Sequence, residues 1–206
     1  MRKSLVVLGI LGALLTGPAL AGVELKEDGN YKVVSLERSE KPKVIEFFSY
    51  GCPHCYRFEP FVQAWLKTKP EDVSVLRVPV AFHDEWKFYA QAYYVADVLK
   101  VLDKTHEALF DHVHKDGQHF KSEDDIVSFY ESLGIPGDSV RRELNGFAVK
   151  SKLAQADHLI KKYQVLSVPS FVVNDQLQVL MKDGEHPDGL TLENLGEGLN
   201  ALVQKP

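Results

Sequence analysis

The segment Val44-Ile45-Glu46-Phe47-Phe48-Ser49-Tyr50-Gly51-Cys52-Pro53-His54-Cys55 joins a strand pattern to a helix pattern through a pair of cysteines. Residues 44–48 are β-rich and almost wholly apolar, which is typical of a buried strand. Residues 49–51 turn the chain, and helical spacing follows, with apolar side chains at Cys55, Phe58, Val62, Trp65 and Leu66. Pro60 falls inside this helix and is expected to kink it. We therefore predict a strand, a turn and a helix that carries the C-x-x-C at its start.

The next segments extend this pattern. Residues 73–80 have the composition of a second strand, which completes a βαβ unit. From residue 84 to about residue 163 only helical patterns occur. They include a helix capped by Ser122 and stopped by Gly134, and a further helix that begins near Asp138 or Ser139 and continues toward residue 163.

Strand patterns return near the C-terminus. Residues 170–173 and 176–180 are joined through Asn174-Asp175, two residue types that tolerate the positive φ of a tight hairpin. A last helix is expected from Thr191, with leucines at 192, 195, 199 and 202. The predicted order is βαβ, a block of helices, and then ββα.

The first residues have the pattern of a cleaved signal peptide. Arg2 and Lys3 precede an apolar run over residues 5–15, and Ala19-Leu20-Ala21 provides an A-x-A cleavage site. The apolar run is shorter than the ~20 residues that a spanning helix needs. The net charge of the whole chain is −5, without a block of Lys and Arg that could bind a phosphate backbone. We expect an exported protein whose residues 1–21 are removed and which has no nucleic-acid partner.

The only cysteines are Cys52 and Cys55. A disulfide between them closes too small a loop to stabilise the fold much, so the pair indicates chemistry. At a helix start, Cys52 faces unpaired N–H groups and the positive end of the helix dipole, which favour a thiolate. We therefore predict Cys52 as the exposed nucleophile and Cys55 as the more buried resolving thiol. Pro53 is pre-set for the first helical turn, and His54 adds a dipole or a positive charge beside the sulfur.

A metal-binding module is an alternative interpretation of the cysteine pair. Structural zinc needs four ligands, and no second C-x-x-C or well-spaced histidine pair completes the set. The nearby polar run around His112, His114, Lys115, Asp116 and His119 has the composition of a solvated helix end and loop. The sequence therefore favours redox chemistry without a metal.

From Phe47 to Tyr56 the sequence, FFSYGCPHCY, resembles the DsbA family of bacterial thiol-disulfide interchange proteins, and Ser167-Val168-Pro169-Ser170 adds to the likeness. The resemblance implies an α/β thioredoxin fold with an inserted all-helical domain. We expect a discontinuous thioredoxin-like domain over residues 22–82 and 154–206, and the helical domain over residues 83–153.

The resemblance also implies roles for residues outside the cysteine pair. Pro169 matches the family's cis-proline opposite the redox centre, and Val168 matches the residue that offers backbone groups to a substrate. Glu46 matches an acid beneath the active site, with Glu59 and Arg77 as charged neighbours. These three could relay protons and tune Cys55, or only form an ion pair at a strand edge. Arginine at 77 departs from the family's lysine and cannot release a proton.

By this resemblance, the protein is a monomeric periplasmic oxidant. It donates a Cys52–Cys55 disulfide to reduced exported proteins without a soluble cofactor, and a DsbB-like, quinone-linked membrane protein reoxidises it. Two alternatives remain open besides the metal module. One is a disulfide isomerase or reductase on the same fold, and the other is a non-enzymatic folding chaperone that binds unfolded chains through the helical block.

Overall fold

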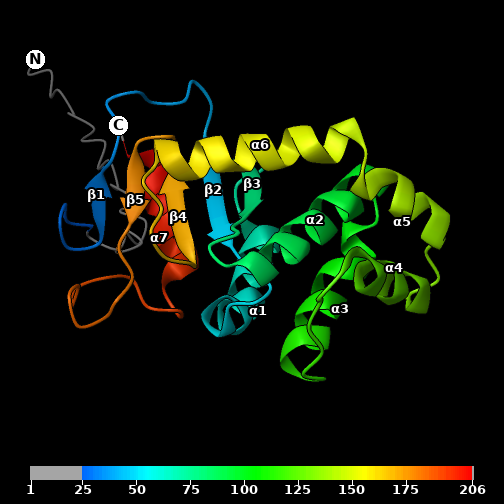
Figure 1. Cartoon of the computed structure of the whole chain (residues 1–206). Helices are drawn as coiled ribbons and strands as arrows, with labels where there is room; N and C mark the ends of the chain where they lie inside the picture. Colours follow the sequence, from blue (N-terminus) through cyan, green and yellow to red (C-terminus); the bar gives the residue numbers. More distant parts are fainter. Residues whose placement is uncertain (1–24, 206) are drawn as a thin grey trace, which may run out of the picture.

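The computed structural model describes residues 25–205, which form one five-stranded sheet and seven helices (Figure 1). The strands, in the order in which they lie across the sheet, are β1 (Tyr31–Val33), β5 (Leu177–Val179), β4 (Ser170–Val173), β2 (Lys43–Phe48) and β3 (Ser74–Pro79). β2 and β3 are parallel, and the other neighbouring pairs are antiparallel. The helices are α1 (Pro53–Thr68), α2 (Asp84–Leu99), α3 (Leu102–His114), α4 (Glu123–Ser132), α5 (Gly137–Leu144), α6 (Phe147–Lys162) and α7 (Leu195–Gln204).

The sheet is covered on both faces, so its central strands β2 and β4 are buried except at Lys43. Alternate residues of a strand face opposite sides, so β2 contributes Val44 to one core and Ile45 to the other. The Val44 side packs with Trp65 of α1 and Leu199 of α7. The Ile45 side packs with residues of α2 to α6. The predicted α/β class, a thioredoxin fold with a helical insertion, is confirmed.

The helical insertion lies between β3 and β4 and extends beyond the edge of the sheet (Figure 1). Ser122 caps α4 as predicted, in a reciprocal capping box with Asp125. The prediction of a single helix from Asp138 or Ser139 toward residue 163 is wrong. The segment forms two helices, α5 and α6, which are separated at Asn145 and Gly146. The extended backbone of Gly146 is the N-cap of α6. Glycine and asparagine are poor helix formers, so this is where the pattern breaks.

Two further differences concern short segments. The strand β1 was not expected, since its three residues are too few to show an alternating pattern. The last helix begins at Leu195 and not at Thr191, because the Asn194 side chain accepts the Thr191 N–H at 2.7 Å and holds a turn there. At the β4–β5 hairpin, both Asn174 and Asp175 have positive φ, as predicted.

Two expectations concern the ends of domains and of the chain. α6 runs without interruption through the expected domain boundary between residues 153 and 154. The expected signal peptide, residues 1–21, lies outside the described residues. Within residues 25–205, no helix is long and apolar enough to span a membrane.

Candidate active site

Cys52 lies at the turn between β2 and α1, where it is the N-cap residue of the helix. Its Sγ accepts a hydrogen bond from the backbone N–H of Cys55 at 3.4 Å. The turn before it is closed by two bonds to Ser49: the Cys52 N–H donates to the Ser49 carbonyl at 3.1 Å, and the Gly51 N–H donates to the Ser49 hydroxyl at 3.2 Å. Pro53 occupies the first helical position, as expected. α1 continues unbroken through Pro60.

Both cysteine residues are buried. Cys52 is 6% exposed and Cys55 is 2% exposed, so the expectation of an exposed Cys52 is wrong for the residue as a whole. The sulfur lies 3.4 Å from the Val168 carbonyl oxygen, to which the thiol donates when it is protonated, and this contact helps to cover it. Both cysteines are free thiols in this structure.

The pKa of the Cys52 thiol is lowered to about 6. The hydrogen bond from the Cys55 thiol contributes most, and it acts against burial, which raises the pKa. The backbone N–H groups of Cys55 and His54 add to the lowering, followed by the charge of His54. Burial raises the pKa of Cys55 far above its ordinary value. At neutral pH the pair is therefore a thiolate at Cys52 and a thiol at Cys55.

His54 projects from the exposed side of the first helical turn. Arg57, one turn further along α1, donates from Nη2 to His54 Nδ1 at 2.7 Å. Because arginine only donates, Nδ1 accepts, and a neutral His54 carries its proton on Nε2. Arg57 was not among the predicted site residues.

Val168 and Pro169 lie opposite Cys52, although they are more than 110 residues away in the sequence. The Val168–Pro169 peptide bond is cis, as predicted. Both residues are partly exposed. The segment therefore places two partly exposed residues beside the Cys52 sulfur.

Glu46, Glu59 and Arg77 meet in one buried cluster. Glu46 and Arg77 are paired residues of β2 and β3, with Arg77 Nη2 donating to Glu46 Oε1 at 3.2 Å. Arg77 Nε and Glu46 Oε2 are 2.6 Å apart, but neither atom makes a well-directed hydrogen bond. Arg77 Nη1 also donates to Glu59 Oε1 at 3.0 Å. The prediction that these three residues are neighbours is confirmed, and β3 is the edge strand of the sheet.

The two carboxyl groups of the cluster differ in acidity. Burial raises the pKa of Glu46, and Arg77 only partly offsets it. Burial acts in the same direction on Glu59, but hydrogen bonds from His106 and Arg77 outweigh it and hold the pKa of Glu59 well below its ordinary value. Glu59 is therefore the ionised partner of Arg77, and Glu46 is the carboxyl group that binds a proton more readily.

His106 of α3 completes the cluster and was missed by the sequence analysis. Its Nε2 lies 3.0 Å from Glu59 Oε1 and 2.7 Å from Arg77 Nη1, and its Nδ1 lies 2.6 Å from the Tyr50 hydroxyl. Burial lowers the pKa of His106, as does Arg77. The sequence does indicate that His106 is buried, because it precedes Leu109 and Phe110 by three and four residues on the apolar face of its helix.

His114, at the end of α3, also differs from expectation. It is not a solvated residue: it is partly buried, and its Nε2 lies 2.7 Å from the backbone carbonyl of Tyr50. It therefore contacts the active-site turn directly.

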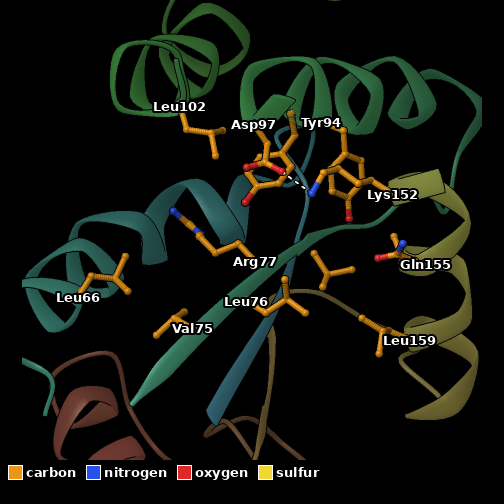
Figure 2. A pocket seen from close by; sticks show the side chains of 13 residues that line it. Leu66, Val75, Leu76, Arg77, Tyr94, Asp97, Leu102, Lys152, Gln155 and Leu159 are labelled. Carbon is orange, nitrogen blue, oxygen red and sulfur yellow. Dashed lines mark ion pairs between the residues drawn. The ribbon is translucent and has the colours of Figure 1, made fainter. Parts of the chain in front are cut away.

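Two cavities lie beside the charge cluster. One, of about 350 Å³, is lined by Arg77 between Leu66 of α1 on one side and Gln155 and Leu159 of α6 on the other, with the Asp97–Lys152 ion pair at its rim (Figure 2). The other, of about 1090 Å³, lies between α1 and α3 and includes Glu59 and His106. Neither is lined by a cysteine, so the cavities flank the cluster and not the sulfurs. Among residues 25–205, no group of three or more His, Cys, Asp or Glu side chains is arranged to hold a metal ion.

A thioredoxin fold with an acidic cysteine at the start of its first long helix, and a cis-proline segment beside that cysteine, defines the chain as a thiol-disulfide oxidoreductase. A family model described as "DSBA-like thioredoxin domain" matches residues 43–191. The chain belongs to the DsbA family.

Individual relatives agree with this assignment. The chain is 35% identical to a thiol:disulfide interchange protein DsbA from Pseudomonas syringae pv. tomato, with 84% of each chain covered. It is 36% identical to DsbA from Azotobacter vinelandii, covering 80% of this chain and 84% of that one. Among solved structures, a single-residue variant of Pseudomonas aeruginosa DsbA matches with a TM-score of 0.80 at 28% identity, covering 88% of this chain and 97% of that one.

Proposed function

We propose that Cys52 is the sulfur through which this oxidoreductase exchanges disulfides, and that it works as a donor of disulfides to reduced exported proteins. The observation that carries the proposal is the difference in acidity within the pair, with the pKa of Cys52 at about 6 and that of Cys55 far above its ordinary value. A stabilised thiolate is a better leaving group, which favours the reduced form and makes the disulfide more oxidising.

The reaction then has two exchange steps. A substrate thiolate attacks the Cys52 sulfur of the Cys52–Cys55 disulfide, forming a mixed disulfide and releasing Cys55, which takes up a proton. A second thiolate of the substrate attacks the substrate's own sulfur in the mixed disulfide and releases Cys52 as a thiolate. The substrate loses two electrons and gains a disulfide, and the enzyme is left as a dithiol without a soluble cofactor.

Val168 and Pro169 are proposed to receive the substrate as an extended segment. The position of Val168, partly exposed and next to Cys52, supports this role, because an extended peptide beside it could form main-chain hydrogen bonds. A solved structure of a Proteus mirabilis DsbA variant, which matches with a TM-score of 0.72 at 25% identity, is described as a complex with the non-covalently bound peptide PWATCDS.

The buried charges are proposed to have separate roles. Glu59 and Arg77 form the ion pair that holds the cluster, because arginine keeps its proton. Glu46, which interacts with Cys55, is left as the group to accept or return a proton there, since burial raises its pKa.

The cellular setting is proposed from the family and from the signal-peptide pattern of residues 1–21. The protein would act as a monomer in the periplasm, with a DsbB-like quinone-linked membrane protein as its oxidant. The redox chemistry would lie in residues 22–82 and 154–206, and the helical domain of residues 83–153 would help to select substrates.

Two measurements test the proposal. Alkylation of the reduced protein at mildly acidic pH, followed by mapping of the label, should modify Cys52 in preference to Cys55. Equilibration with glutathione should leave the pair reduced over conditions in which an ordinary protein disulfide stays oxidised. Labelling mainly at Cys55 would contradict the assignment of the nucleophile, and a strongly reducing pair would favour the reductase or isomerase. A double Cys52→Ser, Cys55→Ser variant that still assists folding would favour the chaperone.

A further inference from the structure

Tyr50 holds an unusual position in the active-site turn. It lies two residues before Cys52, and its side chain is only 1% exposed. Its ring packs edge-on against Phe110 of α3, with the ring centroids 4.7 Å apart. Tyr50, in the turn just before Cys52, is therefore packed against the helical insertion.

Two histidines of α3 bind Tyr50 at opposite ends. The Tyr50 hydroxyl is 2.6 Å from His106 Nδ1, and the Tyr50 backbone carbonyl is 2.7 Å from His114 Nε2. A carbonyl can only accept, so His114 must donate through Nε2. The two histidines are eight residues apart, just over two helical turns, and so share one face of α3.

α3 also contacts the chain on the other side of the cysteine pair. Tyr56 directly follows Cys55, and its ring stacks on that of His114 at 4.7 Å with an interplanar angle of 17°. The Tyr56 hydroxyl donates to Asp111 Oδ1 at 3.2 Å. One helix therefore contacts both residues that flank the segment from Gly51 to Cys55.

We propose that His106 and His114 are positioning residues for Cys52, which act through Tyr50 to hold the turn that carries the sulfur. The thiolate depends on the direction of the backbone N–H groups of His54 and Cys55, and these directions are set by the turn and the first residues of α1. The turn's own backbone bonds involve only Ser49. The hydrogen-bond partners of the Tyr50 hydroxyl and carbonyl both come from α3. This inference rests on the proposed role of Cys52 as the exchanging sulfur.

The test compares four variants of the full chain: His114→Ala, His114→Gln, Tyr50→Phe and His112→Ala. Thiolate absorbance against pH gives the pKa of Cys52, and the oxidised form reacted with a dithiol peptide gives the exchange rate. His114→Ala should raise the pKa of Cys52 by up to about one unit, which corresponds to the loss of one hydrogen bond to the thiolate. His114→Gln keeps an N–H donor and should restore most of the difference. Tyr50→Phe keeps the buried ring but removes the contact with His106, and should give a smaller rise.

His112→Ala is the matched control. His112 lies on the same helix, but its ring contacts Phe120 and Phe129 within the insertion. Its replacement should alter the thermal stability without moving the pKa of Cys52. If His114→Ala does not fold, Tyr50→Phe still carries the test, since it keeps the buried ring of residue 50 in place.

The proposal is overturned if Tyr50→Phe and His114→Ala leave both the pKa and the exchange rate at the unsubstituted values, or if His112→Ala shifts them equally. Failure of the proposed function would look different. A chain that does not transfer its disulfide would have no exchange rate to compare, but the pKa of Cys52 would still respond to the loss of the α3 contacts.

Discussion

The active-site turn and the charge cluster of Arg77 both hold buried charge, but they stabilise it by different means. At the turn, the Cys52 thiolate is held by the Cys55 thiol and by backbone N–H groups of α1. In the cluster, Glu46, Arg77, Glu59 and His106 are held by each other's side chains. Backbone groups survive most substitutions and side-chain partners do not. Apart from Cys55 itself and the tightly packed Gly51, the turn should therefore tolerate single changes that the cluster cannot.

The largest effect should come from Arg77→Leu. It leaves Glu46 and Glu59 buried without their shared cation, which costs about 3–5 kcal/mol for a buried pair broken on one side. Denaturant unfolding of the reduced protein measures the loss. Arg141→Leu is the control, because Arg141 makes its ion pair with Asp124 in solvent and should change stability little. Equal losses in the two variants would show that the cluster does not depend on its side-chain partners.

Gly51→Ala should have the next largest effect, and it tests how tightly the turn is packed. A Cβ at Gly51 would collide with the Trp86 indole of α2. Overpacking of this kind costs about 1–3 kcal/mol. Gly184→Ala is the matched change, since nothing lies near that position. The cost should fall when Trp86→Leu is combined with Gly51→Ala. If Gly51→Ala costs no more stability than Gly184→Ala, the turn is not packed tightly against Trp86.

The segments that were predicted from sequence differ in kind from those that were not. β2, α1 and the helical block carry strong periodic patterns. The cysteine pair could be predicted as a redox centre from its C-x-x-C spacing at the start of a helix. The break between α5 and α6 and the start of α7 depend on single residues, Gly146 and Asn194, which outweigh the periodic pattern around them.

The site residues follow the same division. Glu46, Glu59 and Arg77 could be predicted because the resemblance covers them. The position of His106 on the apolar face of α3 could be predicted, but the partners of His106 and His114 could not, because they depend on the docking of α3 against a turn more than 50 residues earlier. An apolar face shows that a helix is buried, but not which partner it meets.

At neutral pH, where only part of the shift of the Cys52 pKa counts, a smaller effect on stability depends on the redox state. In the reduced protein the folded pKa of Cys52, about 6, lies below the ordinary value of 9.0. The unfolded chain therefore binds more protons between these values, and the stability of the reduced form should rise with pH across that window and be lost as pH falls through about 6. Denaturant midpoints of both forms test this. The reduced form should be the more stable at neutral pH, and the gap should widen toward pH 9; an oxidised form that is clearly the more stable would favour a reductase.

The smallest effect should come from His54→Ser. The charge of His54 ranks below the backbone and Cys55 contributions to the acidity of Cys52. The pKa of Cys52 should rise but remain well below 9.0, the protein should become a weaker oxidant, and the reduced form should lose more stability than the oxidised form. Thiolate absorbance, glutathione equilibrium and the two denaturant midpoints measure these changes together. A higher pKa without a matching fall in oxidising power would separate acidity from redox function in this protein.

The continuity of α6 limits how this chain could be recombined with its relatives. Its residues run from the insertion to the sheet, and a junction after residue 153 would cut a helix in its middle. The hydrogen bonds that cross such a junction hold successive turns together, so a chimaera joined there would have to match the helix phase of both parents. A graft that takes the whole of Phe147–Lys162 from one parent moves the junction into a loop, where the backbone has fewer partners to lose.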